Sequence, residues 1–111
     1  MQRILLIDPS RDVFELVSRL LAAACIVQWA VTLADARTML DAEVFDLALM
    51  DVDMPDGEGF DFVSILQAHA NLQHLPVIFL TTRGSAADKV LGFSLGALDY
   101  IVKPFCPHEF R

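Results

Sequence analysis

The sequence has few of the features that mark secreted or membrane-spanning proteins. It has only two cysteines, Cys25 and Cys106, and neither lies in a CxxC or other metal-ligand spacing. This excludes a disulfide framework and favours free thiols in a reducing compartment. No apolar run approaches the roughly 20 residues that span a bilayer, and the first residues lack the pattern of a secretory signal peptide. We therefore expect a cytoplasmic location and no membrane partner.

Basic residues are also scarce. The chain has 8 Lys and Arg against 15 Asp and Glu, and its formal net charge is −7. Because nucleic-acid binding requires a basic face, we expect no direct contact with nucleic acid. Internal repeats and linkers are absent as well, and 55% of the 111 residues are hydrophobic. These properties predict one folded domain with a single continuous architecture.

What the sequence does contain is an alternation of short apolar runs and amphipathic stretches. The expected strands are residues 4–7, 26–31, 47–50, 77–80 and 100–102. The expected helices are residues 12–24, 34–42, 60–70 and 86–95. Strand–helix alternation gives parallel pairing with right-handed crossovers. The sequence therefore predicts an α/β fold: a doubly wound, five-stranded parallel sheet of order 2-1-3-4-5, of the flavodoxin-like (βα)5 type.

Polar residues follow four of the five expected strands. They are Asp8 after the first strand, Asp51, Asp53 and Asp56 after the third, Thr81 after the fourth and Lys103 after the fifth. Doubly wound sheets bind their ligands outside the carboxyl ends of the strands, where the strand order reverses. Carboxylates suit Mg²⁺, and an ammonium and a hydroxyl suit a phosphoryl group. The sequence therefore predicts a magnesium-assisted phosphoryl site at this edge.

Four segments, spread over essentially the whole chain, carry a resemblance to a known family. In chain order they are RILLID, DLALMDVDMPDGEGF, PVIFLTTRG and GALDYIVKPF. In this order and spacing they resemble the CheY-like response-regulator receiver family of two-component signalling. The resemblance implies that residues 1–111 form a receiver domain. It implies a phospho-accepting signalling domain and not a metabolic enzyme. The only catalysis expected of such a domain is its own phosphorylation and slow dephosphorylation.

The resemblance also implies roles for single residues. Asp51 would take a phosphoryl group from a sensor histidine kinase or a phosphotransfer protein, and Lys103 would pair with the phosphoryl oxygens. Thr81 would donate a hydrogen bond to the same group. Tyr100 would then change rotamer and fill the space that Thr81 vacates, which makes Thr81 and Tyr100 the expected switch pair.

One departure from the family concerns the metal. Receivers usually have two adjacent acids after the first strand, but this chain has Asp8-Pro9. The second acid commonly ligates Mg²⁺, and proline has no side-chain oxygen. The expected ligands are therefore Asp8, Asp51 and Asp53, with weakened binding. Two functions stay open: a phosphorylated receiver, and a pseudo-receiver that acts as an unphosphorylated protein-interaction module.

Two further expectations concern the end of the chain and its partners. Leu91 and Leu98 stand where receivers generally have polar residues. With Tyr100 they predict an exposed apolar patch on the fourth helix and fifth strand, suited to a homodimer or an output domain. Pro107 predicts the first turn of a last helix. The family continues this helix further, so we expect it to be truncated at Arg111 and to continue in a longer protein.

Overall fold

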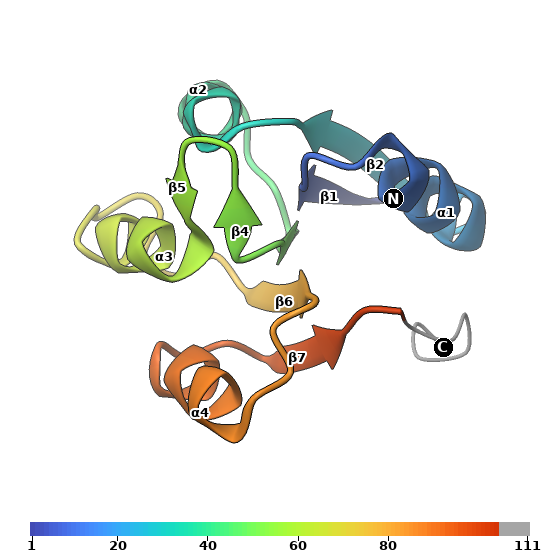
Figure 1. The fold of residues 1–111 in the computed structure, drawn as a ribbon. Helices are drawn as coiled ribbons and strands as arrows, with labels where there is room; N and C mark the ends of the chain where they lie inside the picture. The colour runs from blue at the N-terminus through green and yellow to red at the C-terminus, as the bar shows by residue number, and fades with distance from the viewer. Residues whose placement is uncertain (105–111) are drawn as a thin grey trace.

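Five parallel strands form a central sheet in the order β2-β1-β3-β6-β7 (Figure 1). A computed structural model describes residues 1–104; the expected last helix and Cys106 lie outside the described residues. The strands are β1 (Gln2–Ile7), β2 (Cys25–Ala30), β3 (Leu47–Met50), β6 (Val77–Thr81) and β7 (Asp99–Val102). The last two correspond to the fourth and fifth expected strands, so the predicted order 2-1-3-4-5 is confirmed.

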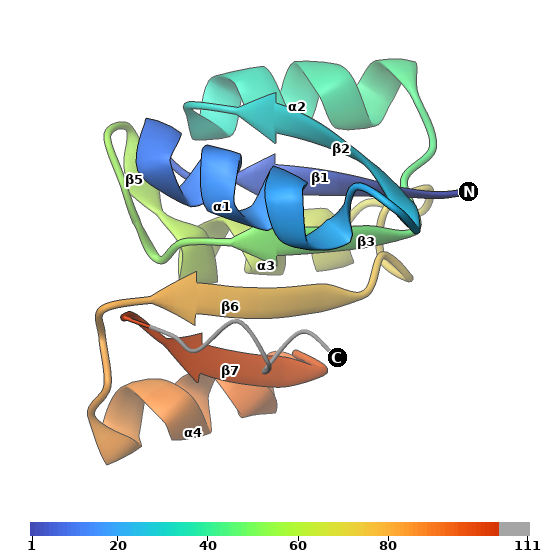
Figure 2. The same cartoon turned by 90° about the vertical axis from the view of Figure 1, so that its right-hand side faces the viewer.

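The helices of the described residues lie on both faces of this sheet. They are α1 (Arg11–Leu21), α2 (Leu33–Ala42), α3 (Gly59–Gln67) and α4 (Ala86–Ser94). Figures 1 and 2 show α1 on one face and α2, α3 and α4 on the other, as doubly wound sheets require. Helix α1 ends three residues earlier than expected because β2 already begins at Cys25 and residues 22–24 form the turn. None of the described helices is long and apolar enough to cross a membrane.

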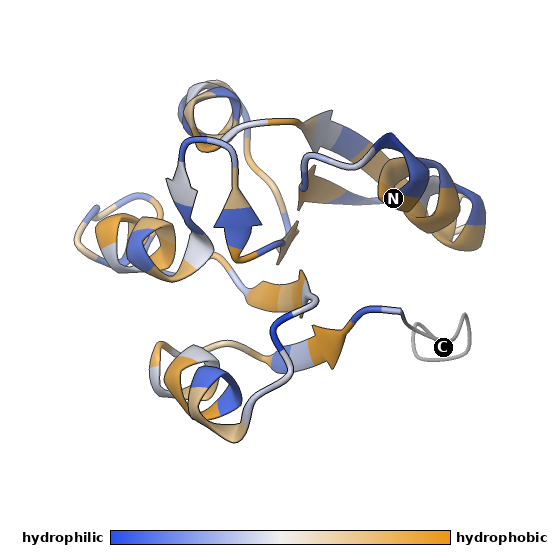
Figure 3. Cartoon of the chain, in the orientation of Figure 1, coloured by the Kyte–Doolittle hydropathy of each residue, from blue (hydrophilic) through white to orange (hydrophobic). Residues whose placement is uncertain are grey.

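Each face of the sheet has its own hydrophobic core. Successive strand side chains point to opposite faces, so Leu5 and Ile7 pack under α2 and α3, whereas Ile4 and Leu6 pack against Val17 of α1. This double burial explains why β1 is apolar without alternation. Figure 3 shows the same pattern: β6 is hydrophobic along its length, and α1 carries bands of both kinds.

A short antiparallel hairpin follows β3, where the sequence predicts only a loop. Its strands are β4 (Asp53–Met54) and β5 (Gly57–Glu58). Gly57 has a φ of +153°, a conformation that disfavours residues with a Cβ atom. At Gly59, which follows the hairpin, an added Cβ atom would lie 2.6 Å from the carbonyl oxygen of Asp51. The start of α3 therefore packs directly on the residues that follow β3.

Candidate functional site

The carboxyl ends of four adjacent strands bring the predicted polar residues to one edge of the sheet. Asp8 directly follows β1, Asp51 follows β3, Thr81 ends β6 and Lys103 follows β7. The register supports this arrangement: the Asp51 N–H donates to the Ile7 carbonyl at 2.9 Å. The Lys103 N–H donates to the Thr81 carbonyl at 2.8 Å.

Lys103 connects two carboxylates. Its Nζ lies 2.7 Å from Oδ2 of Asp8 and 3.2 Å from Oδ2 of Asp51. The side chains are 14%, 0% and 11% exposed for Lys103, Asp8 and Asp51, respectively. Two buried anions repel each other strongly in a low dielectric. The shared ammonium reduces that repulsion and holds the two carboxylates together.

Both oxygens of Asp8 are engaged. Oδ2 accepts from Lys103, and Oδ1 accepts from the Ser10 N–H at 2.8 Å. Burial raises the pKa of Asp8 above its usual value, although the hydrogen bonds from Lys103 and Ser10 oppose this shift. The negative charge of Asp51 raises it further. Asp8 therefore lies in a site where a cation is favourable, because added positive charge offsets the cost of burying the carboxylate.

Thr81 is fully buried at the end of β6. Its Oγ1 accepts from the Arg83 N–H at 3.3 Å. A hydroxyl also has a proton to donate. The Thr81 hydroxyl can thus donate a hydrogen bond to an added oxygen ligand at this edge, while the residue keeps its place in the strand.

Asp53 lies beside the site but is held by Arg83. Its N–H donates to Oδ1 of Asp51 at 3.3 Å, and its own Oδ1 lies 3.1 Å from Nε of Arg83. Arg83 also pairs with Glu58 at 2.9 Å and Asp88 at 3.7 Å. The sequence analysis did not single out Arg83. Its position two residues after Thr81, directly beyond the end of β6, is the signal that could have found it.

Asp56 does not belong to the site, although the sequence analysis grouped it with the acids after β3. Its two oxygens accept from the N–H groups of Leu33 and Ala34, at 2.9 and 3.0 Å. These are the first two residues of α2. The two hydrogen bonds lower the pKa of Asp56. Asp56 is therefore a cap of α2, because the hairpin turns it away from Asp51.

Tyr100 is buried, so the expected patch of Leu91, Leu98 and Tyr100 is wrong for its third member. The Tyr100 hydroxyl donates to the Arg83 carbonyl at 2.7 Å, and burial raises its pKa. A Cβ atom added at Gly92 would lie 2.7 Å from the ring of Tyr100. This close approach of α4 covers the ring. Leu91 and Leu98 remain exposed, at 43% and 65%.

The donors at this edge fit a magnesium ion that keeps most of its water. Among residues 1–104, no group of three or more His, Cys, Asp and Glu side chains lies close enough to hold a metal. Asp8 and Asp51 supply two carboxylates, and the Asp53 carboxylate pairs with Arg83. Mg²⁺ commonly uses one or two carboxylates together with water and phosphate oxygens. The backbone carbonyl of Asp53 would be the group that this residue could offer to a metal.

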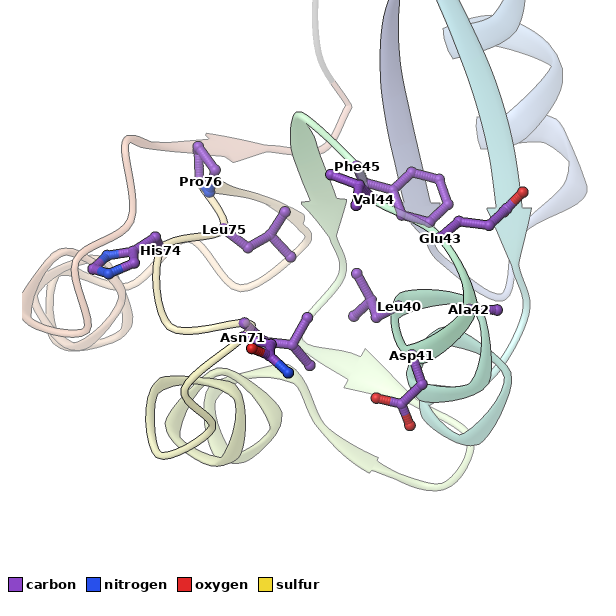
Figure 4. Close-up of a pocket in the computed structure, with 11 residues that line it drawn as sticks. Leu40, Asp41, Ala42, Glu43, Val44, Phe45, Asn71, His74, Leu75 and Pro76 are labelled. Carbon is purple, nitrogen blue, oxygen red and sulfur yellow. The ribbon is translucent and has the colours of Figure 1, made fainter.

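A separate pocket lies at the opposite edge of the sheet. It opens between the end of α2 and the segment that precedes β6, and Figure 4 shows its lining residues. Leu40, Phe45 and Leu75 are among its apolar lining residues, and Asp41 and His74 are among its polar ones. It shares no residue with the cluster around Asp51.

Comparisons with known proteins agree with this architecture. The family model described as "Response regulator receiver domain" matches residues 4–111. The chain is 39% identical to the transcriptional regulatory protein GltR of Pseudomonas aeruginosa over 107 residues, covering 96% of this chain and 44% of GltR. It is 40% identical to the transcriptional regulatory protein CpxR of Escherichia coli over 111 residues, covering 98% and 46%. It thus spans less than half of each relative.

A solved structure gives the same result. The non-phosphorylated HemR receiver domain of Leptospira biflexa superposes with a TM-score of 0.89 at 35% identity. The superposition covers 99% of this chain and 88% of that one. The family match, the relatives and the shared fold together identify the chain as a member of the response regulator receiver domain family.

Proposed function

We propose that this receiver domain accepts a phosphoryl group on the carboxylate of Asp51. The observation that carries the proposal is the contact of Lys103 with both Asp8 and Asp51 at the edge where Thr81 ends β6. This arrangement combines a carboxylate nucleophile, a cation and a hydroxyl, which are the groups that aspartyl-phosphate chemistry uses. Response regulators receive their phosphoryl groups from histidine kinases. We expect the donor here to be a sensor histidine kinase or a phosphotransfer protein.

The residues divide the work of the transfer. An oxygen of Asp51 attacks the phosphorus atom; the new O–P bond forms as the bond from phosphorus to the donor breaks, and the donor leaves with its electron pair. Lys103 and Thr81 offer an ammonium and a hydroxyl to the phosphoryl oxygens. Asp8, Asp51 and the Asp53 carbonyl would hold Mg²⁺, which would neutralise further negative charge on the phosphoryl oxygens. The domain acts as a switch, and its catalysis is limited to its own phosphorylation and slow dephosphorylation.

The switch involves Thr81 and Tyr100. A phosphoryl group on Asp51 adds charge and oxygen acceptors close to the Thr81 hydroxyl. Movement of Thr81 toward that group changes the space beside the Tyr100 ring, whose hydroxyl bonds to the Arg83 carbonyl. Tyr100 in turn packs against α4 at Gly92. A local change at Asp51 thereby reaches α4 and β7.

We infer that α4 and the residue before β7 bind a protein partner. Val90, Leu91, Phe93 and Leu98 are 67%, 43%, 49% and 65% exposed. The net charge of −7 argues against nucleic acid, so a second copy or an output domain is the better partner. Leu98→Ser should weaken self-association of the phosphorylated domain in sedimentation, whereas Val44→Ser, which changes an exposed valine between α2 and β3, should not. A wild type that stays monomeric throughout would contradict dimerisation.

Intact-mass spectrometry tests the phosphorylation. With acetyl phosphate and Mg²⁺, the wild type should gain one phosphoryl group and Asp51→Asn none. Asp41→Asn, which removes a carboxylate of the opposite edge, should gain one as the wild type does. Equal labelling of Asp51→Asn would exclude Asp51 as the acceptor. No labelling of the wild type would instead support a pseudo-receiver, the function that Pro9 favours.

A further inference from the structure

The chain's only tryptophan contacts the phosphoryl site through the backbone of Asp8. Trp29 lies in β2, beside β1. Its indole Nε1–H donates to the carbonyl oxygen of Asp8 at 2.7 Å. The Asp8 N–H donates to the Ala30 carbonyl of the same strand at 3.1 Å. Both peptide groups that flank the Asp8 side chain are therefore anchored on β2, one by a backbone group and one by the indole.

The indole is itself held in place. The ring of Phe14, from α1, stacks on Trp29 with ring centroids 4.8 Å apart and an angle of 7° between the planes. Helix α1 begins directly after the Asp8 turn, with Ser10 as its N-cap. A rotation of the indole away from Asp8 would lose this stacking. The stack supports the ring, and the 2.7 Å hydrogen bond itself holds the N–H at the Asp8 carbonyl.

Pro9 leaves the turn with one backbone donor fewer. Proline has no N–H and a fixed φ, so residue 9 can donate no hydrogen bond to the turn. Two hydrogen bonds hold the turn: the Ser10 N–H donates to Oδ1 of Asp8, and the indole N–H donates to the carbonyl of the Asp8–Pro9 peptide. Without the indole, that peptide group would lose its side-chain partner on β2.

We propose that Trp29 is a positioning residue for the Asp8 carboxylate and, through it, for the Mg²⁺ that the site binds. The proposal rests on the proposed function, because it assigns Asp8 to the metal. It differs from a packing role in one respect: the hydrogen bond, and not the ring, carries the effect. Replacing a residue that hydrogen-bonds to a metal-ligating residue, and so orients it, commonly changes the metal affinity.

Two variants separate the hydrogen bond from the ring. Trp29→Phe keeps an aromatic ring against Phe14 but removes the N–H, whereas Phe14→Leu keeps the N–H but removes the stack. Calorimetric titration with MgCl₂ should show an affinity about three- to tenfold lower for Trp29→Phe, the range of one lost hydrogen bond. Phe14→Leu should change the Mg²⁺ affinity less than about twofold, even if it lowers the melting temperature as much as Trp29→Phe does. Equal Mg²⁺ affinity of Trp29→Phe and wild type would overturn the proposal, and so would equal losses in both variants.

A measurement on the wild type avoids any loss of folding in the variants. With one tryptophan, a ¹⁵N-labelled sample gives one indole N–H resonance. MgCl₂ should shift this resonance along the same binding curve that calorimetry gives, and NaCl at matched ionic strength should leave it in place. An indole resonance that stays fixed while Mg²⁺ binds would overturn the proposal.

The outcomes keep this proposal apart from the proposed function. Labelling of Asp51→Asn, or a wild type that binds Mg²⁺ but takes no phosphoryl group, would remove the function and leave the Mg²⁺ result for Trp29 valid. A labelled wild type with Mg²⁺ affinity unchanged in Trp29→Phe would remove only the role of Trp29. A wild type that binds no Mg²⁺ would overturn the role of Trp29 by itself.

Discussion

The carboxyl edge of the central sheet, where the parallel strands end, and the amino edge, where they begin, differ in the side chains that they bury. Among the described residues, the buried polar side chains are Asp8, Asp51 and Thr81, and all three lie at the carboxyl edge. At the amino edge, the charged groups keep contact with solvent. The Arg3–Glu43 ion pair there is 35% and 37% exposed, with an N–O distance of 2.8 Å. Exposed pairs of that kind contribute little to stability.

This difference shows where the fold sacrifices stability. Burial of a carboxylate is unfavourable unless it is paired and hydrogen-bonded. At the carboxyl edge two carboxylates share one lysine, so the pairing is incomplete. A packed apolar edge, such as the one that Leu40 and Phe45 help to form, has no such cost. The incompletely compensated charge is therefore the better indicator of a functional site, even though a pocket opens at the other edge.

The largest expected effect comes from removing the shared cation. Lys103→Met should lower the free energy of unfolding by about 3 kcal/mol at neutral pH, because it leaves two buried carboxylates without their partner. Urea denaturation measures this loss. Lys89→Met removes an exposed lysine of α4 and should change stability by less than about 0.5 kcal/mol. Equal stability of the two variants would mean that Lys103 does not compensate the carboxylates.

The sheet and the gathering of the site residues could be predicted because few elements decide them. β1 and β6 are apolar without alternation, which indicates burial on both faces. Once the strand order is fixed, the residues that follow β1, β3 and β7 must meet at one edge. Hence Asp8, Asp51 and Lys103 could be brought together without any side-chain geometry.

The contacts around those residues could not be predicted, because they depend on how distant segments approach. Asp56 follows Asp51 by five residues, and only the hairpin geometry shows that it faces α2. Tyr100 was expected to be exposed, but the absence of a side chain at Gly92 lets α4 cover its ring. The bond from Trp29 to Asp8 joins residues 21 apart, and no local pattern encodes it.

A smaller effect is expected from crowding the carboxyl edge with one methyl group. Gly59→Ala places a Cβ atom 2.6 Å from the Asp51 carbonyl oxygen, a backbone atom that has little freedom to move. Alanine favours a helix by up to about 1 kcal/mol over glycine, but overpacking costs about 1–3 kcal/mol, so a net loss is expected.

Gly84→Ala is the matched control for Gly59→Ala. Its Cβ atom would lie 3.2 Å from a methyl group of Val102, which has more freedom to adjust. Urea denaturation of both variants decides the comparison. If Gly59→Ala is as stable as Gly84→Ala, then the end of β3 adjusts more easily than the close contact implies.

The smallest effect concerns Asp56, which is close to Asp51 in sequence but lies outside the buried cluster. The N–H groups of Leu33 and Ala34 lower its pKa below the usual 3.8, so folding favours the ionised form. Its contribution to stability is therefore present above pH 3.8 and is lost as the pH falls through the lowered pKa of the folded state.

Asp56→Asn should have a lower melting temperature than the wild type at pH 7, and this gap between the two melting temperatures should close in strong acid. Asp61→Asn, which removes an exposed charge from the first turn of α3, should show a smaller gap. A gap for Asp56→Asn that persists unchanged at low pH would mean that shape, and not charge, makes Asp56 a cap. Phosphoryl labelling of Asp56→Asn should match the wild type, because this carboxylate serves α2 and not Asp51.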